Sequence, residues 1–232
     1  MSQKHSNIEI PWEEIETILL DMDGTLLDLN FDNHVWNEAL PAAYANKHSL
    51  SLESARASLI KHMREIQGTI SFYSFDYWTR YTELDIIELH RNYAHLVEFR
   101  PGARSFLKWA KQAQKTTIIA TNAHPDSIMV KDEVCGVSSL VDYVVSSHHY
   151  DSPKETSEFW QRLKEEYNLN EKKCLFIDDN APVLESSEKF GVAYNLIISK
   201  PDSNKPTKTN LNYPSFNHYA EICQYLDTSI NE

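Results

Sequence analysis

Two aspartates directly after a short apolar run are the residues of this chain best placed to do chemistry. Asp21 and Asp23 follow the apolar residues 18–20, and Gly24 comes directly after Asp23. Such a run suits a strand buried on both faces of a parallel sheet, and glycine allows a sharp turn after it. The acids are therefore expected at the carboxyl end of a central strand, where open α/β sheets bind ligands. Because neighbouring carboxylates repel each other, the pair predicts a divalent cation, and Mg²⁺ prefers such oxygen ligands.

Polar residues also follow later runs, in types that phosphoryl transfer would need. Thr121 and Asn122 end one aliphatic run, Asp178 and Asp179 end another, and Lys154 lies between them in the sequence. A carboxylate can attack phosphorus, and a second acid can move a proton. A hydroxyl, an amide and a lysine can bind phosphoryl oxygens, and further acids can complete a metal site. We expect catalysis by Asp21, Asp23, Thr121 and Lys154, phosphate binding by Thr121, Asn122 and Lys154, and metal binding by Asp21, Asp23, Asp178 and Asp179.

These residues can meet only if the apolar runs are strands of one sheet. Short aliphatic runs predict strands, and apolar residues spaced three or four apart predict helices. Strands that alternate with helices predict an α/β fold with a doubly wound parallel sheet, whose strands all end at one edge. The expected strands cover residues 15–21, 116–120, 143–146, 174–177 and 193–198, and the expected helices cover 103–113, a segment after Pro125, 154–167, 181–190 and 216–226.

A different pattern fills residues 34–98, where apolar residues recur every three or four positions without a strand-like run. It predicts four helices, the second capped near Ser49 or Ser51. The chain is therefore expected to divide into a catalytic core, residues 1–30 and 99–232, and an inserted helical cap domain, residues 31–98.

The two ends of the core have less regular sequences. Residues 1–14 are expected to form an arm whose Ile8, Ile10 and Trp12 pack on the core. Residues 200–214 are rich in Pro, Asn, Lys and Ser and predict a loop before the last helix.

Composition argues against several classes of protein. The 232 residues are 41% hydrophobic and carry a formal net charge of -12. Nucleic acids and anionic membranes require basic surfaces, so neither is an expected partner, and no apolar run approaches transmembrane length. The three cysteines form no C-x-x-C pair, which predicts neither a zinc site nor a disulfide framework. A cytoplasmic protein that acts on a small molecule is expected, and its oligomeric state is left open.

Four stretches, DMDGTLLDL, IIATNA, SPKE and LFIDDN, together resemble the haloacid-dehalogenase superfamily of phosphohydrolases. The resemblance implies a Rossmannoid core in which Asp21 is the nucleophile and Asp23 the general acid and base. It also implies that Thr121 binds the phosphoryl group and that Lys154 braces it. Dehalogenases of the superfamily lack the second aspartate of the first motif, so Asp23 favours phosphate chemistry.

The same resemblance implies where a metal and a cap would lie. Mg²⁺ would be held by Asp21, the backbone carbonyl of Asp23 and the pair Asp178 and Asp179, with Asp179 in direct contact. The helical domain of residues 31–98 stands where the superfamily carries its C1 cap.

Three longer stretches are similar to the bacterial 5′-nucleotidases that prefer purines and hydrolyse GMP and IMP: DMDGTLLDLNFDNHVW, FDYWTRYTELD and TNAHPDSIMVK. This resemblance includes the cap, which chooses the substrate, and it implies Mg²⁺-dependent hydrolysis of a purine nucleoside 5′-monophosphate through an aspartyl-phosphate. His124 could line the pocket or cap a helix. Candidates for base recognition, for most of which core packing is the competing interpretation, are Phe31, Asn33, Trp36, Tyr73, Asp76 and Trp78.

Other functions share parts of this pattern. A sugar-phosphate phosphatase or phosphomutase would have the same core and a different cap. A receiver-like module that uses a phosphorylated aspartate as a switch has a similar sheet, but it lacks the inserted helices and spaces its motifs differently. A scaffold protein with a decayed site would not be expected to keep all the acids and Lys154.

Overall fold

The centre of the computed structural model, which describes residues 8–223, is a six-stranded sheet in which every pair of neighbouring strands is parallel. In the middle, Leu20 lies opposite Ile119 on one side and Ile177 on the other. The predicted doubly wound α/β fold is thereby confirmed. In sheet order the strands are β3 (Tyr143–Ser146), β2 (Thr116–Thr121), β1 (Thr17–Leu20), β4 (Cys174–Asp178), β5 (Tyr194–Ile198) and β6 (Ser215–Phe216).

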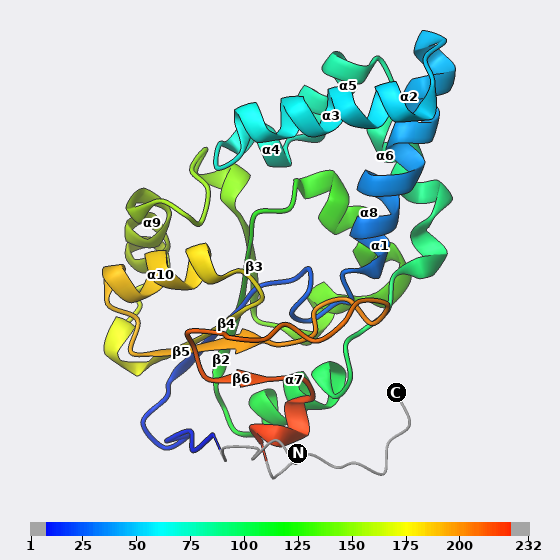
Figure 1. Cartoon of the computed structure of the whole chain (residues 1–232). Helices are drawn as coiled ribbons and strands as arrows, with labels where there is room; N and C mark the ends of the chain where they lie inside the picture. Colours follow the sequence, from blue (N-terminus) through cyan, green and yellow to red (C-terminus); the bar gives the residue numbers. More distant parts are fainter. Residues whose placement is uncertain (1–7, 224–232) are drawn as a thin grey trace.

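Helices cover both faces of this sheet (Figure 1). Alternate residues of β1 point to opposite faces, so Ile18 and Leu20 join one core cluster and Leu19 the other. Each such fully buried aliphatic side chain contributes about 1.5–3 kcal/mol, which is why the run before the acids is apolar throughout. The first cluster includes α7 (Ala103–Gln112) and α8 (Pro125–Cys135), and the second includes α9 (Ser157–Tyr167) and α10 (Ala181–Phe190).

A separate helical layer stands above the sheet edge in Figure 1 and has a small core of its own. Ser51 caps one helix by accepting a hydrogen bond from the Ser54 amide, as predicted. Four helices is too simple a description, because a π-helical turn interrupts the first predicted helix and Ser74 separates two short helices in the third. The segments are α1 (Asn30–His34), the π turn (Val35–Ala39), α2 (Leu40–His48), α3 (Leu52–Ile66), α4 (Ile70–Tyr73), α5 (Phe75–Thr82) and α6 (Ile86–Asn92).

The end of the described chain differs from the prediction. Over residues 216–223 the expected helix is wrong, and residues 224–226 lie outside the described part. Residues 215–216 form β6 instead, because the Ser199 amide and the Phe216 carbonyl pair across the sheet at 2.9 Å. A single 3₁₀ turn, Tyr219–Glu221, follows.

Two other expectations concern the N-terminal arm and membrane-spanning helices. Ile8, Ile10 and Trp12 do pack on the core, as predicted for the arm. Among residues 8–223, none of the helices has both the length and the apolar character needed to cross a membrane.

Candidate active site

The strand ends bring the predicted polar residues around one cavity of about 350 Å³, within the range of about 300–1,000 Å³ common for small-molecule sites. Asp21 and Asp23 follow β1, Thr121 ends β2 and Asp178 ends β4. Lys154 lies on the loop before α9, which begins at Ser157 and not at Lys154 because Thr156 caps it. The helical layer of α1 to α6, called the cap from here on, supplies the opposite wall of the cavity.

Lys154 is the cation at the centre of the site. Its Nζ donates to Asp21 Oδ1 at 2.6 Å and to Asp178 Oδ2 at 2.7 Å, and only 2% of its side chain is exposed. Its backbone is fixed as well: the Lys154 amide donates to Asn122 Oδ1, and Trp160 Nε1 donates to the Lys154 carbonyl. The position of the ammonium is therefore fixed both by its own ion pairs and by the hydrogen bonds of the Lys154 backbone.

Burial raises the pKa of the acids around this lysine. Desolvation is the largest cause at Asp21, and it outweighs the opposing Lys154 ammonium to raise the pKa to about 7. Desolvation likewise raises the pKa of Asp178 to about 6 and that of Asp23 to about 6, where Asp32 adds to the rise. Burial alone would lower the pKa of Lys154, but Asp178 and Asp21 raise it overall. Such shifted groups gathered in a cleft are typical of functional sites.

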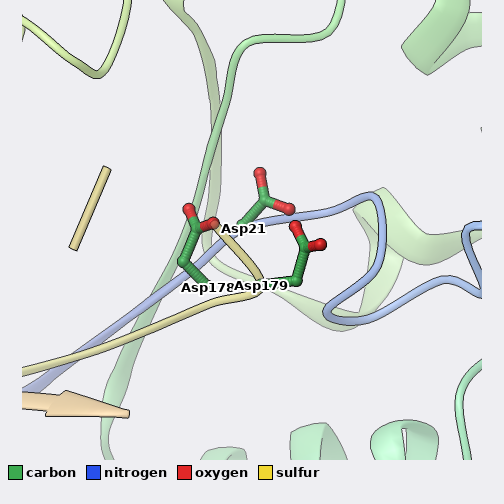
Figure 2. A group of neighbouring side chains, drawn as sticks. All are labelled: Asp21, Asp178 and Asp179. Atoms are coloured by element: carbon green, nitrogen blue, oxygen red, sulfur yellow. The ribbon is translucent and has the colours of Figure 1, made fainter. Parts of the chain in front are cut away.

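Three of the carboxylates fit a metal ion. Asp21, Asp178 and Asp179 each offer an oxygen, and these oxygens lie within 4.8 Å of one another, with all three side chains converging in Figure 2. When ionised, the five carboxylates of this region pair directly with only three lysines: Asp21 and Asp178 with Lys154, Asp23 and Asp32 with Lys131, and Asp179 with Lys208. The five carboxylates then carry two more negative charges than the three lysines neutralise, and one hard divalent cation would balance them.

Mg²⁺ is expected to stabilise the protein, and more so at pH 7.5 than at pH 5. The raised pKa values mean that the metal-free acids keep protons in the folded state that they lose in the unfolded state, so stability falls as the pH rises through about 6 to 7. At pH 7.5 the acids are largely ionised, so the cation relieves the repulsion between their negative charges without having to displace protons. At about 100 times its Kd it should add about 2.7 kcal/mol, or roughly 5–10 °C in Tm.

Melting curves in EDTA and in MgCl₂ at both pH values measure this effect. Asp179→Asn should lose most of the Mg²⁺ shift, whereas Glu185→Gln, an exposed acid on α10, should keep it. An equal shift in Asp179→Asn, or with NaCl of the same ionic strength, would contradict the metal assignment.

Gly24 is packed against one of these acids. Its φ is +87°, and a Cβ there would lie 2.9 Å from Asp179 Cγ and 3.0 Å from Pro201 Cβ. Gly24→Ala should therefore displace Asp179 and weaken Mg²⁺ affinity by about 10- to 100-fold, as changes around metal ligands commonly do. Gly68→Ala is a matched control, because Gly68 has a similar φ of +80° and open space around its Cβ position. A titration of the Mg²⁺ dependence that gives equal constants for both variants would disprove the coupling.

Asn122 makes contacts that the sequence did not indicate. Its amide oxygen accepts from the Lys154 backbone, and its Nδ2 donates to Glu155 Oε2 at 3.0 Å. Glu155 Oε1 in turn accepts from the Tyr73 hydroxyl of the cap at 2.7 Å. Asn122 thus ties the Lys154 loop to the end of β2, and Glu155 links that loop to the cap. Thr121 Oγ1 accepts from the Ala123 amide at 3.1 Å and faces the same cavity.

A second buried lysine was missed by sequence reasoning. Lys131 Nζ lies 2.8 Å from Asp23 Oδ1 and 2.7 Å from Asp32 Oδ1, and its side chain is 1% exposed. A signal exists in the sequence, since Ser127, Val130 and Lys131 share the three-and-four spacing of the buried face of α8. A lone lysine on a helix is ordinarily solvated, so the pattern alone did not single it out.

The base-recognition candidates have different surroundings. Phe31 and Trp78 are almost fully buried, at 1% exposure, and belong to the core clusters. The Asp76 side chain is 81% exposed and does not line the cavity. Asn33, Trp36, Tyr73 and also Trp78 line it, together with residues that were not among the candidates, such as Asn37, Met63, Phe72 and Phe75. His124 both caps α8 and lines the cavity.

Comparison with known proteins gives one family. The model of the haloacid dehalogenase-like hydrolases matches residues 15–191. A protein of Escherichia coli (strain K12) named GMP/IMP nucleotidase YrfG is 34% identical over 220 residues, which cover 95% of this chain and 99% of that protein. The protein of the same name from Shigella flexneri matches to the same extent.

Solved structures agree on the fold. A HAD phosphatase from Thermococcus onnurineus superposes with a TM-score of 0.73 at 17% identity, covering 89% of this chain and 95% of that one. CbbY from Rhodobacter sphaeroides, crystallised with phosphate, gives a TM-score of 0.60 at 14% identity, covering 89% and 96%. At these identities the likeness concerns the architecture.

Proposed function

The chain belongs to the haloacid dehalogenase-like hydrolases, and we propose that it is a Mg²⁺-dependent phosphatase of purine nucleoside 5′-monophosphates such as GMP and IMP. The proposed reaction rests on the buried Asp21–Lys154–Asp178 arrangement at the strand ends. The observation that carries the substrate is the 34% identity to a GMP/IMP nucleotidase over nearly the whole chain, cap included.

In the first step, Asp21 attacks the phosphorus of the ester. A bond forms between an Asp21 oxygen and phosphorus while the bond from phosphorus to the 5′-oxygen breaks, and Asp23 gives its proton to the departing oxygen. Lys154, with Thr121 and Asn122 beside it, binds the phosphoryl oxygens as negative charge builds on them.

In the second step, Asp23 takes a proton from a water molecule, which then attacks the phosphorus of the aspartyl-phosphate. Phosphate leaves and the Asp21 carboxylate is restored. A pKa near 6 suits Asp23 to both tasks, because it can hold a proton in one step and accept one in the next near neutral pH.

Asp21, Asp179 and the backbone carbonyl of Asp23 would hold Mg²⁺, with Asp178 beside them. When bound, the ion would neutralise charge on the transferring phosphoryl group. We assign direct contact to Asp179 because Asp178 already accepts hydrogen bonds at both oxygens, from Lys154 and from the Asn180 amide.

The cap side of the cavity has the character that a purine requires. Half-buried rings of Trp36, Phe72 and Tyr73 offer faces for stacking. Asn33 and Asn37 offer amides, ordered by a hydrogen bond between them at 3.2 Å and by Asp202, which accepts from Asn33 at 2.6 Å. Trp36 and Asn37 belong to the π-helical turn Val35–Ala39, a local irregularity that is frequent at functional sites.

Trp36→Leu should lower kcat/KM for GMP by about 5- to 150-fold, because stacking of a base on an aromatic ring contributes about 1–3 kcal/mol. Hydrolysis of ribose 5-phosphate, which has no base, should change by less than about 2-fold and serves as the control substrate. Leucine keeps apolar volume beside Trp78 and His90, the rings nearest to Trp36. Equal losses on both substrates would show that Trp36 only supports the fold.

Catalytic phosphate release tests the reaction class. Purified protein with MgCl₂ and GMP is expected to release many equivalents of inorganic phosphate and guanosine per enzyme. A receiver-like switch would instead stop after about one equivalent of phosphoryl group. Release limited to one equivalent would therefore refute the proposed function.

A further inference from the structure

Lys131 joins three segments of the chain at one buried point. Asp23 lies on the loop after β1, Asp32 lies on α1 at the entrance to the cap, and Lys131 lies on α8, which begins just after Thr121 and Asn122. The ammonium contacts both carboxylates, and it also lies 5.3 Å from the centre of the Phe31 ring. A buried lysine with two acids and an aromatic ring around it has little freedom to move.

The loop that carries Asp23 does not need this lysine for its backbone. The amides of Leu26 and Leu27 both donate to the Met22 carbonyl, and the Gly24 amide donates to the Leu27 carbonyl. These bonds close the turn on their own. The contact with Lys131 is made by the side chain of Asp23, so its effect falls on the carboxyl group.

We propose that Lys131, itself held by Asp32, is the positioning residue that aims the Asp23 carboxyl at the leaving oxygen of the substrate. The inference rests on the proposed function, in which Asp23 moves the proton. With Asp23 Oδ1 bound to the ammonium, the proton of the neutral acid resides on Oδ2. The contact thus selects which oxygen donates and fixes its direction.

The consequence depends on the leaving group. When a P–O bond to a nucleoside 5′-oxygen breaks, the electron pair stays on a strongly basic alkoxide, which needs the proton from Asp23 Oδ2. When p-nitrophenyl phosphate reacts, p-nitrophenolate is stable enough to leave without one. A misaimed Asp23 should therefore slow the first step with GMP and spare the first step with the aryl ester.

Single-turnover experiments with enzyme in excess isolate this step, since release of the alcohol precedes hydrolysis of the aspartyl-phosphate. With MgCl₂ present, Lys131→Met should release guanosine from GMP about 100-fold more slowly than the wild type, a typical contribution of proton transfer. Release of p-nitrophenol from p-nitrophenyl phosphate should slow by less than about 5-fold. Methionine keeps the length of the side chain and removes its charge.

Lys131→Met leaves two half-buried acids without their cation and could unfold the protein. The double variant Asp32→Asn/Lys131→Met removes one of those charges and should show the same selective loss in a protein whose far-UV circular dichroism matches the wild type. Equal slowing of both esters by the folded double variant, or no slowing with GMP, would overturn the role of Lys131.

Asp23→Asn separates this inference from its premise. If Asp23→Asn slows GMP selectively and the Lys131 variants do not, the positioning role alone fails. If Asp23→Asn slows both esters equally, the assignment of Asp23 as the proton donor fails, and the inference about Lys131 falls with it.

Discussion

Asp21→Asn is expected to lower kcat for phosphate release from GMP by at least about 10⁴-fold, because an amide cannot attack phosphorus in place of the carboxylate. The fold should survive, since Asn has the same shape and Asp21 is held by a backbone bond to Ile177 as well as by Lys154. Above pH 7 the metal-free variant should be at least as stable as the wild type. Burial raises the pKa of Asp21 to about 7, so ionising it in the folded state costs free energy that Asn avoids.

Initial rates with saturating GMP and MgCl₂, together with melting curves at pH 8, measure both effects. Asp85→Asn is a suitable control, because Asp85 caps α6 and Asn caps helices equally well. Asp21→Asn that retains more than about 1% of wild-type turnover would remove Asp21 from the role of nucleophile.

Lys154→Met should damage both activity and stability. It removes the cation that contacts Asp21 and Asp178 at 2.6 and 2.7 Å, and removal of one partner from a buried ion pair costs about 3–5 kcal/mol. The cost should be large at pH 8 and much smaller at pH 5. Below a pKa of about 6 to 7 the two acids take up protons and no longer need the cation, whereas above it they must be buried as anions.

Urea unfolding at pH 5 and pH 8, compared between the variant and the wild type, gives this difference directly. Lys208→Met offers a contrast, because Lys208 pairs with Asp179 at 3.1 Å but is 40% exposed, so its loss should be small at both pH values. Equal destabilisation by Lys154→Met at pH 5 and pH 8 would contradict the electrostatic account. Activity with GMP should fall at least about 10³-fold, since in the proposed function Lys154 binds the transferring phosphoryl group.

The sheet could be predicted because its strands are short, aliphatic and buried on both faces. The parallel arrangement then places Asp21, Thr121 and Asp178 at one edge with no further information, since each directly follows or ends a strand. Lys154 is different, because its loop is fixed by two hydrogen bonds that no local pattern reveals: the Lys154 amide donates to Asn122 Oδ1, and Trp160 Nε1 donates to the Lys154 carbonyl.

The last strand could not be predicted, because β6 is two residues long and depends on pairing with β5. Its sequence has no alternation long enough to compete with the helical pattern that Tyr219 and Ile222 suggest. Both of those side chains are buried against the main core, so their spacing reflects packing of a single turn and not a continuing helix.

The ion pairs of Asp23 and Asp32 with Lys131 also could not be predicted from local sequence patterns. Asp32 and Lys131 are separated by 99 residues and meet only because α1 and α8 come together beside the loop after β1. The same holds for the contact of Tyr73 with Glu155, which joins the cap to the core across 82 residues. Residues that link two parts of a fold are specified by tertiary packing, whereas residues at strand ends are specified by the strands.

The substrate preference tests the central claim most directly. With purified protein at fixed MgCl₂, kcat/KM is compared among GMP, IMP, CMP, UMP and glucose 6-phosphate. The proposed function predicts that GMP and IMP exceed the pyrimidine nucleotides and the sugar phosphate by at least about 10-fold, the value of roughly 1.4 kcal/mol of base recognition in the transition state. A kcat/KM for glucose 6-phosphate equal to or above that for GMP would contradict it and would indicate a sugar-phosphate phosphatase built on the same core.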